Sequence, residues 1–183
     1  MGRIAVAKNF YLDEFIDPFT YFKTETKGQV IIDKRLYSIA QLLRDKYGKP
    51  IYINNWYTLV YEKLKDEKSI DEIISLIENT TKFNGTNIYK WSGIRTSRTD
   101  IGSKTSAHRK YKAIDPKGDE KKLFKIIKEN AKEFYDLGVR RVEDISITPG
   151  WLHIDTLIKS YDAPNRIKVI DRTKITQLIN IEF

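Results

Sequence analysis

The chain has 183 residues, 40% of them hydrophobic, and a formal net charge of +8. This length suits one domain, and the hydrophobic content is enough for a packed core, so wholesale disorder is excluded. The sequence has no cysteine, which excludes a disulfide scaffold, a thiolate metal site and a cysteine nucleophile, so any metal must be held by histidines and carboxylates.

The excess of basic residues favours polyanionic partners, which include nucleic acid, anionic lipid surfaces and the acidic polymers of a bacterial wall. A nucleic-acid partner is not expected, because the sequence has no recognition motif and no clustered aromatic and basic platform. No segment approaches the roughly 18 apolar residues of a membrane helix. The N-terminal apolar run has four residues, too few for a signal peptide, so neither a membrane span nor an export signal is expected.

The first element in chain order is a helix within residues 31–50. Its apolar stripe recurs every three and four residues, and Gly48 followed by Pro50 ends it; the stripe comprises Leu36, Ile39, Leu43 and Tyr47. We expect this helix to pack one face on a sheet. The next segment, IYINN at 51–55, alternates apolar and polar residues and is predicted to be a short strand.

Residues 57–88 are predicted to form a helical insertion. Ser69 and Glu72 have the spacing of a capping box that opens a helix, and the NGT sequence at 84–86 is typical of a turn. The insertion is either a surface decoration or a lid or wall-binding element over a site. The sequence alone leaves both possibilities open.

Residues 89–115 are rich in Ser, Thr, Gly and Arg, which indicates an ordered loop region. A single amphipathic helix is predicted over 118–138, with Gly138 closing it; its stripe comprises Leu123, Ile127, Ala131 and Phe134. Two strand-like runs follow, VEDISI at 142–147 and GWLHIDTLI at 150–158.

The only two histidines, His108 and His153, each lie near an aspartate. In a strand alternate residues share a face, so His153 and Asp155 point the same way. His108 precedes Asp115 by seven residues, an odd number, so a turn or bulge must intervene if both are to meet. Two imidazoles and one carboxylate are the composition of a catalytic zinc site, although spacing alone equally permits two unrelated histidines.

The sequence motifs around the two histidines indicate the type of site more specifically than the spacing does. SGIRTS, then SAHRKYKAID, then WLHID, together resemble the zinc D-Ala-D-Ala carboxypeptidase and phage endolysin family, whose fold is shared with hedgehog signalling domains. The family pattern is S-G-x-R, then S-x-H-x-x-G-x-A-x-D, then a hydrophobic pair before His. The resemblance covers most of the chain outside 57–88. Tyr111 departs from it, because the family has Gly there, a residue that permits positive φ.

The resemblance implies an α+β fold of the hedgehog/DD-peptidase type, with a small antiparallel sheet flanked by helices. It implies one peptidase-like domain over 1–183 with the insertion at 57–88. His108, Asp115 and His153 would bind Zn²⁺. Arg95 would act at the substrate carbonyl or carboxylate, and Ser106 would hydrogen-bond the substrate or a ligand.

The general base is less clearly marked. In the family an acidic residue shortly before the last His fills this role, but the position three before His153 is Gly150. Glu143 suits a longer gap and is our preferred candidate. Asp144 and Asp155 are the alternatives, Asp155 being better suited to support a metal ligand.

The implied function is a zinc metallopeptidase that hydrolyses peptidoglycan stem peptides, phage or prophage encoded. Such an enzyme would be made in the cytoplasm and act at the wall after holin release or as a virion component. Its positive charge would aid adsorption to anionic wall polymers. The alternative is a catalytically inactive, zinc-stabilised module of the same fold that binds the wall or another protein.

Overall fold

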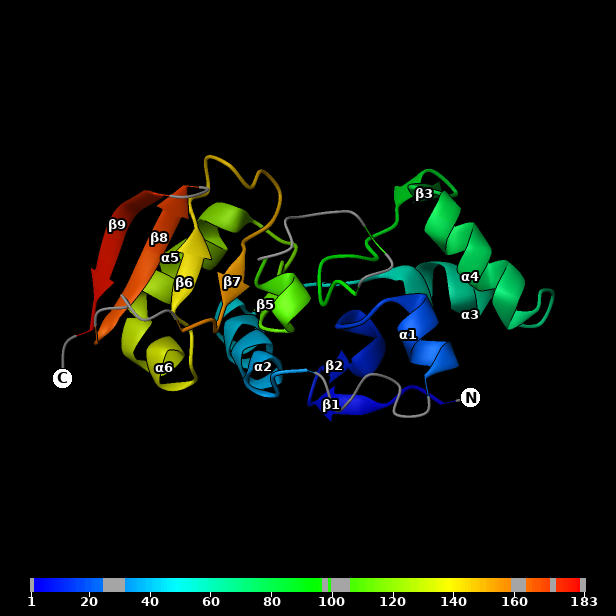
Figure 1. Cartoon of the computed structure of the whole chain (residues 1–183), viewed down its shortest axis with the longest axis horizontal. Helices are drawn as coiled ribbons and strands as arrows, with labels where there is room; N and C mark the ends of the chain where they lie inside the picture. Colours follow the sequence, from blue (N-terminus) through cyan, green and yellow to red (C-terminus); the bar gives the residue numbers. More distant parts are fainter. Residues whose placement is uncertain are drawn as a thin grey trace.

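The computed structural model describes residues 2–24, 32–96, 99, 106–158, 164–171 and 174–181. It has an α+β fold, as predicted, arranged as two lobes side by side (Figure 1). We call residues 2–24 and 51–96 the helical lobe, and residues 32–50 and 106–181 the sheet lobe. One continuous hydrophobic core contains residues of both lobes. Within the described residues, no helix is both long enough and apolar enough to cross a bilayer.

The helical lobe begins with a short hairpin and a helix that Asp17 caps, its carboxylate accepting a hydrogen bond from the Thr20 amide at 3.0 Å. Its elements are β1 (Ala5–Ala7), β2 (Phe10–Tyr11), the 3-10 helix η1 (Leu12–Glu14), α1 (Pro18–Lys23), the π-helix η2 (Tyr57–Tyr61), α3 (Glu62–Leu64), α4 (Ile70–Asn79), β3 (Lys82–Phe83) and β4 (Thr86–Asn87).

Aromatic rings fill the centre of the helical lobe. Trp56 is fully buried, and its ring centroid lies 5.7 Å from that of Tyr21 and 5.5 Å from that of Tyr57. These edge-to-face contacts add to the stabilisation from burying the rings. The Trp56 indole N–H donates to the Ile16 carbonyl at 3.0 Å, so its one polar atom is also satisfied.

The segment 57–88 is helical, as predicted. Ser69 and Glu72 form the predicted capping box, and Asn84 and Gly85 turn the chain with positive φ. The segment is more than a surface decoration, because Ile73 and Ile77 on α4 are fully buried in the main core. The Lys90 ammonium donates to three carbonyls at the end of α4, those of Ile77, Glu78 and Thr80, and so fixes this helix to the loop that follows.

The sheet lobe contains a five-stranded sheet in the order β5-β7-β6-β8-β9, with helices α5 and α6 on one face (Figure 1). Its elements are α2 (Arg35–Tyr47), the 3-10 helix η3 (His108–Lys110), β5 (Ala113–Ile114), α5 (Glu120–Glu129), α6 (Ala131–Asp136), β6 (Arg141–Glu143), β7 (Ile154–Asp155), β8 (Arg166–Asp171) and β9 (Lys174–Asn180). The predicted helix of residues 31–50 is α2, which ends at Gly48 in the left-handed conformation.

The sheet is antiparallel, as predicted, in three of its four strand pairings, and departs from the prediction in the fourth. β6 and β8 are parallel. After β7 the chain crosses to the far side of β6, where β8 runs in the same direction as β6 and opposite to β7. The hairpin of β8 and β9 had no counterpart in the predicted elements. The predicted strand at 51–55 is also reduced to a single bridge between Tyr52 and Lys117, although Ile51 and Ile53 are buried and Tyr52 is exposed.

The predicted helix over 118–138 is divided into α5 and α6 at Asn130. The Asn130 amide side chain donates to the Ile126 carbonyl at 2.8 Å, and its backbone has left the helical conformation. Asparagine competes for backbone groups in this way and interrupts helices. The apolar stripe nevertheless stays on one side, and Leu123, Ile127 and Phe134 are all fully buried.

Strand register gives the sheet one apolar and one polar face. Ile114, Ile154, Val142 and Val169 form a row across four strands on the buried side. Alternation therefore places the residues before and after this row on the other face. The row on one side of it holds Asp155 opposite Arg141, and the row on the other side holds Asp115, His153 and Glu143.

Candidate metal centre

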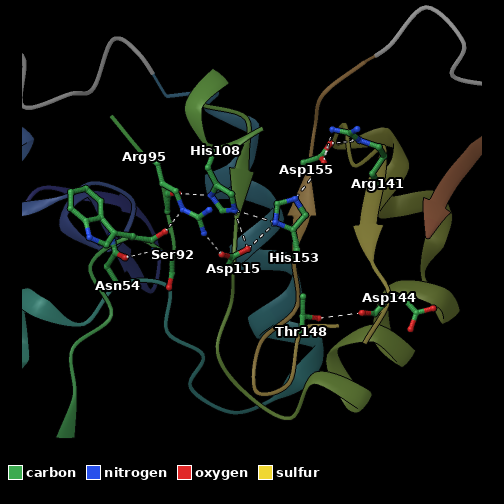
Figure 2. A network of polar contacts seen from close by, with 12 residues as sticks. Asn54, Ser92, Arg95, His108, Asp115, Arg141, Asp144, Thr148, His153 and Asp155 are labelled. Carbon is green, nitrogen blue, oxygen red and sulfur yellow. Dashed lines mark hydrogen bonds and ion pairs between the residues drawn. The ribbon is translucent and has the colours of Figure 1, made fainter. Parts of the chain in front are cut away.

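The three predicted ligands meet at the junction of the lobes (Figure 2). His108 Nε2 lies 3.1 Å from Asp115 Oδ1 and 3.1 Å from His153 Nδ1. His153 Nδ1 lies 2.8 Å from the same Asp115 oxygen. All three side chains are buried, so two imidazole nitrogens and a carboxylate oxygen form a triangle shielded from solvent.

A tight turn brings His108 back over Asp115, as the odd spacing requires. His108 begins η3, and Tyr111 ends it in the left-handed conformation, with φ of 61°. This is the position where the resembling family has Gly, and the backbone here adopts the conformation that Gly allows most easily. The substitution of Tyr for Gly therefore leaves the turn in place at a cost in strain.

Gly93 fixes the orientation of His108. The Gly93 carbonyl accepts a hydrogen bond from His108 Nδ1 at 2.6 Å, which assigns the proton to Nδ1 and leaves the Nε2 lone pair facing the triangle. A side chain at residue 93 would overlap the backbone of Phe15, whose carbonyl accepts from the Ile94 amide at 2.8 Å. Close packing on the helical lobe therefore explains the glycine of the SGIR motif.

Asp155 and Arg141 support His153 on the side of its ring that faces away from the triangle. Asp155 Oδ2 lies 3.4 Å from His153 Nε2, so Nε2 carries a proton and Nδ1 is the nitrogen that a metal ion would use. The Arg141 guanidinium pairs with both Asp155 oxygens, at 3.0 and 2.8 Å, and the Leu157 amide also donates to this carboxylate. Asp155 is thus fully engaged as a support for His153.

Asp115 is held by backbone and by Arg95. Its amide donates to the Ser92 carbonyl at 2.7 Å, and the Ser92 amide donates to the Asn54 side chain at 3.0 Å. Arg95 Nη2 donates to Asp115 Oδ2 at 3.1 Å, which leaves Oδ1 for the triangle. These bonds attach the carboxylate to the helical lobe although it belongs to the sheet lobe.

Burial and charge act differently on the three groups. Burial lowers the pKa of His108 below its ordinary value, the nearby Asp115 charge opposing this only in part. Burial also works against the charged form of His153, but its hydrogen bonds to Asp115 and Asp155 raise its pKa to about 10. Without a metal this imidazole is therefore a cation that donates from both nitrogens, and a metal ion would take the place of the proton on Nδ1. Although burial opposes ionisation, the two imidazoles hold the pKa of Asp115 well below its usual range. Asp115 is therefore an anion at neutral pH, as a metal ligand must be.

The three candidate bases occupy different places. Glu143 is half-buried on the polar face directly opposite His153, and its charge acts on that imidazole. Asp144 lies one residue further, on the other side of the strand, where it accepts hydrogen bonds from the Ser146 amide and the Thr176 hydroxyl, both at 3.0 Å. Of the candidates, Glu143 alone combines proximity to the triangle with a carboxylate not committed to supporting a ligand.

The remaining predicted residue, Ser106, is half-buried, and its carbonyl accepts from the Lys110 amide at 3.2 Å.

Sequence reasoning assigned no role to Arg141 or Lys117. The Lys117 ammonium lies 4.6 Å from the centroid of the Trp151 ring, and its charge acts on Asp115 and Arg95. No sequence signal marks Arg141, because its partner Asp155 is identified only by strand register.

The triangle has the composition and spacing of a metal site. Two ligands on a tetrahedral zinc at bond lengths of 2.0–2.1 Å lie about 3.3 Å apart, close to the observed 2.8–3.1 Å. Each imidazole also donates its second N–H to a carbonyl or carboxylate, as histidine ligands usually do. The group can therefore hold a metal ion.

Comparisons of the chain with protein families, with curated proteins and with solved structures found no match.

Proposed function

We propose that the protein is a zinc metallopeptidase that hydrolyses peptide bonds in bacterial peptidoglycan stem peptides, with the hedgehog/DD-peptidase type of fold. The observation that carries the proposal is the buried triangle of His108, Asp115 and His153, whose ligand atoms are oriented by fixed partners on their far sides. The motifs that resemble the peptidase family are the same segments that build this triangle.

The donor set favours zinc. Two neutral imidazoles and one carboxylate are the protein ligands of known catalytic zinc sites, whereas calcium and magnesium prefer oxygen ligands alone. When bound, zinc would supply Lewis acidity and a water molecule of lowered pKa. His108, Asp115 and His153 would hold it, while Gly93, Arg95 and Asp155 would keep these ligands oriented.

Two further side chains would perform the proton and charge chemistry of amide hydrolysis. The Glu143 carboxylate would accept a proton from the attacking water and deliver it to the leaving amine nitrogen. Arg95 would place positive charge beside the substrate carbonyl oxygen as negative charge develops there. Because Arg95 Nε already donates to the Trp91 carbonyl and Nη2 to Asp115, the substrate would use the remaining guanidinium N–H groups. Ser106 would hydrogen-bond the substrate.

The net charge of +8 supports adsorption to an anionic wall. We further propose a phage or prophage origin and action at the wall after holin release or from the virion, because the segments KNFYLDEF, RDKYGKPIYI and INNW resemble those of phage-encoded members. The bond that it would cleave is a D-Ala-D-Ala terminus, an L-Ala-D-Glu link or a cross-bridge, and the sequence does not select among them.

The experiment that tests this function combines zinc content with hydrolysis of purified peptidoglycan. His108→Ala should lose the zinc that the wild type binds at one per chain, and should lose hydrolysis. Glu143→Gln should keep the zinc and lose hydrolysis by about 10²-fold or more. Asp144→Asn is the matched control and should keep both, because Asp144 faces away from the triangle.

Two outcomes would contradict the proposal in different ways. Bound zinc without hydrolysis of any wall type would favour the inactive binding module. Absence of zinc from the wild type after incubation with the metal would exclude both. Hydrolysis that survives Glu143→Gln would overturn the assignment of the base alone.

A further inference from the structure

An open cleft of about 400 Å³ lies in the helical lobe, a size within the usual range of small-ligand sites. The insertion supplies four of its seven lining residues; the seven are Tyr52, Asn55, Thr58, Leu59, Lys63, Thr86 and Tyr89. The π-helix η2 contributes Thr58 and Leu59, and α3 contributes Lys63. The insertion thus forms one wall of the cleft, and the segments on either side of it form the other.

The lining combines one exposed ring, Tyr52, and one half-buried ring, Tyr89, with one cation and no acid. Tyr52 is 52% exposed, which is unusual for a large ring held in a backbone bridge. Asn55 is occupied internally, because its side chain accepts from the Tyr89 amide at 2.6 Å and donates to the Asn87 carbonyl at 3.0 Å. The Lys63 ammonium has no carboxylate within salt-bridge distance among the described residues. The available chemistry is therefore aromatic surface plus positive charge.

Lys117 connects the cleft to the metal centre. Its ammonium lies 5.2 Å from the centroid of the Tyr89 ring in the cleft wall and 4.6 Å from that of Trp151, two residues before His153. Its backbone pairs with that of Tyr52, the Lys117 amide donating to the Tyr52 carbonyl at 2.6 Å. A ligand that extends from the triangle past Lys117 therefore enters the cleft between Tyr52 and the insertion.

We propose that this cleft is a substrate subsite that binds a carboxylate-bearing part of the stem peptide remote from the scissile bond. The Lys63 ammonium pairs with the carboxylate, and the Tyr52 and Tyr89 rings pack against the aliphatic part of the same residue. This subsite rests on the proposed function, because it takes the substrate to be a stem peptide. It gives the insertion the role of selecting anionic substrates.

The test measures binding by calorimetry to zinc-loaded Glu143→Gln protein, in which turnover is blocked. The probes are a soluble stem peptide with free side carboxylates and the same peptide with those carboxylates amidated. Adding Lys63→Gln should weaken binding of the free acid about tenfold and leave the amidated peptide unaffected. Tyr52→Ala, at an exposed position that the fold tolerates, should weaken binding of both peptides. Lys68→Gln, on the same insertion but outside the cleft, is the matched control and should change neither.

Equal effects of Lys63→Gln and Lys68→Gln, equal affinity for the two peptides, or no binding of either peptide would overturn the subsite. The results also distinguish failure of the subsite from failure of the proposed peptidase function. If the wild type hydrolyses peptidoglycan while Lys63→Gln and Tyr52→Ala retain its KM, the peptidase stands and the subsite fails. If the free acid binds through Lys63 and Tyr52 but the wild type hydrolyses no wall, the subsite stands and the peptidase fails.

Discussion

The aromatic centre of the helical lobe and the triangle of His108, Asp115 and His153 are both buried but are held together by opposite means. Trp56 and its neighbouring rings gain from leaving water and require few hydrogen bonds. His108, Asp115 and His153 lose hydration on burial and depend on fixed partners to offset that loss. Burial of the aromatic rings therefore stabilises the fold, whereas burial of the three ligand side chains costs free energy and holds them in a fixed arrangement.

The largest effect should come from the aromatic region. Trp56→Ala removes a fully buried ring and should lower the free energy of unfolding by about 3–5 kcal/mol, measured by urea denaturation. Ile70→Ala, at a site that is 39% exposed, is the control and should stay within about 0.5 kcal/mol of wild type. If Trp56→Ala lowers the free energy of unfolding by less than about 1 kcal/mol, the aromatic region is not the main source of stability and the comparison fails.

The helical lobe also contains buried acids that work against its stability, Asp13, Glu14 and Asp17, and Glu14 is the one whose pKa rises to near neutrality. Burial raises the pKa of Glu14 from its ordinary 4.5 to about 7, the hydrogen bond from the Tyr11 amide and the charge of Arg3 opposing this only in part. Between these values the Glu14 carboxyl binds more protons in the folded chain than in the unfolded one, so its contribution to stability falls as pH rises from 4.5 to about 7 and is constant above.

The expected loss from Glu14 is about 3 kcal/mol over that interval. Glu14→Gln keeps the acceptor for the Tyr11 amide and should remove this part of the pH dependence, which denaturation at a series of pH values would measure. An unchanged profile in the variant would assign the dependence to other groups.

The polar region should respond in metal affinity more than in folding. Asp155→Asn weakens the acceptor for His153 Nε2 and should lower zinc affinity by about 10- to 100-fold, measured by competition with a chelator. Asp171→Asn, at the far end of β8, is the control and should bind zinc as the wild type does. Unchanged affinity in Asp155→Asn would show that Asp155 does not orient the ligand.

The smallest effect concerns the turn between two ligands. Tyr111→Gly removes the strain of a positive φ but loses the packing of a half-buried ring, so stability should change by less than about 1 kcal/mol and zinc affinity should be unchanged. Tyr111→Val should be clearly worse, because β-branched residues rarely adopt this conformation. Equal stability of the two variants would show that the turn is not strained.

Sequence patterns located α2, the Ser69 cap and the apolar stripe of α5 and α6, because each depends on residues close along the chain. The grouping of His108, Asp115 and His153 was predicted from the resemblance of their motifs to the peptidase family, because spacing alone left it open and required only that a turn intervene. The division at Asn130 and the parallel pairing of β6 with β8 were missed. Both depend on interactions that residue periodicity does not encode.

The residues that support the metal centre could also not be predicted from local sequence patterns. Arg141 pairs with Asp155 only because β6 and β7 lie in a particular register, and Lys117 reaches Tyr89 only after the lobes have packed. Gly93 was recognised as part of a motif, but its contact with Phe15 joins segments distant in the chain. Such contacts require the tertiary structure.

The close approach of Gly93 to Phe15 has a consequence for biosynthesis. Residue 93 positions His108 only when it rests against a segment made much earlier, and the last ligand, His153, is made much later. A growing chain on the ribosome therefore has only two of the three ligands until translation has passed residue 153. Contacts this distant in sequence also form slowly, because closing long loops costs entropy. Zinc capture should therefore be one of the final events in the maturation of the protein.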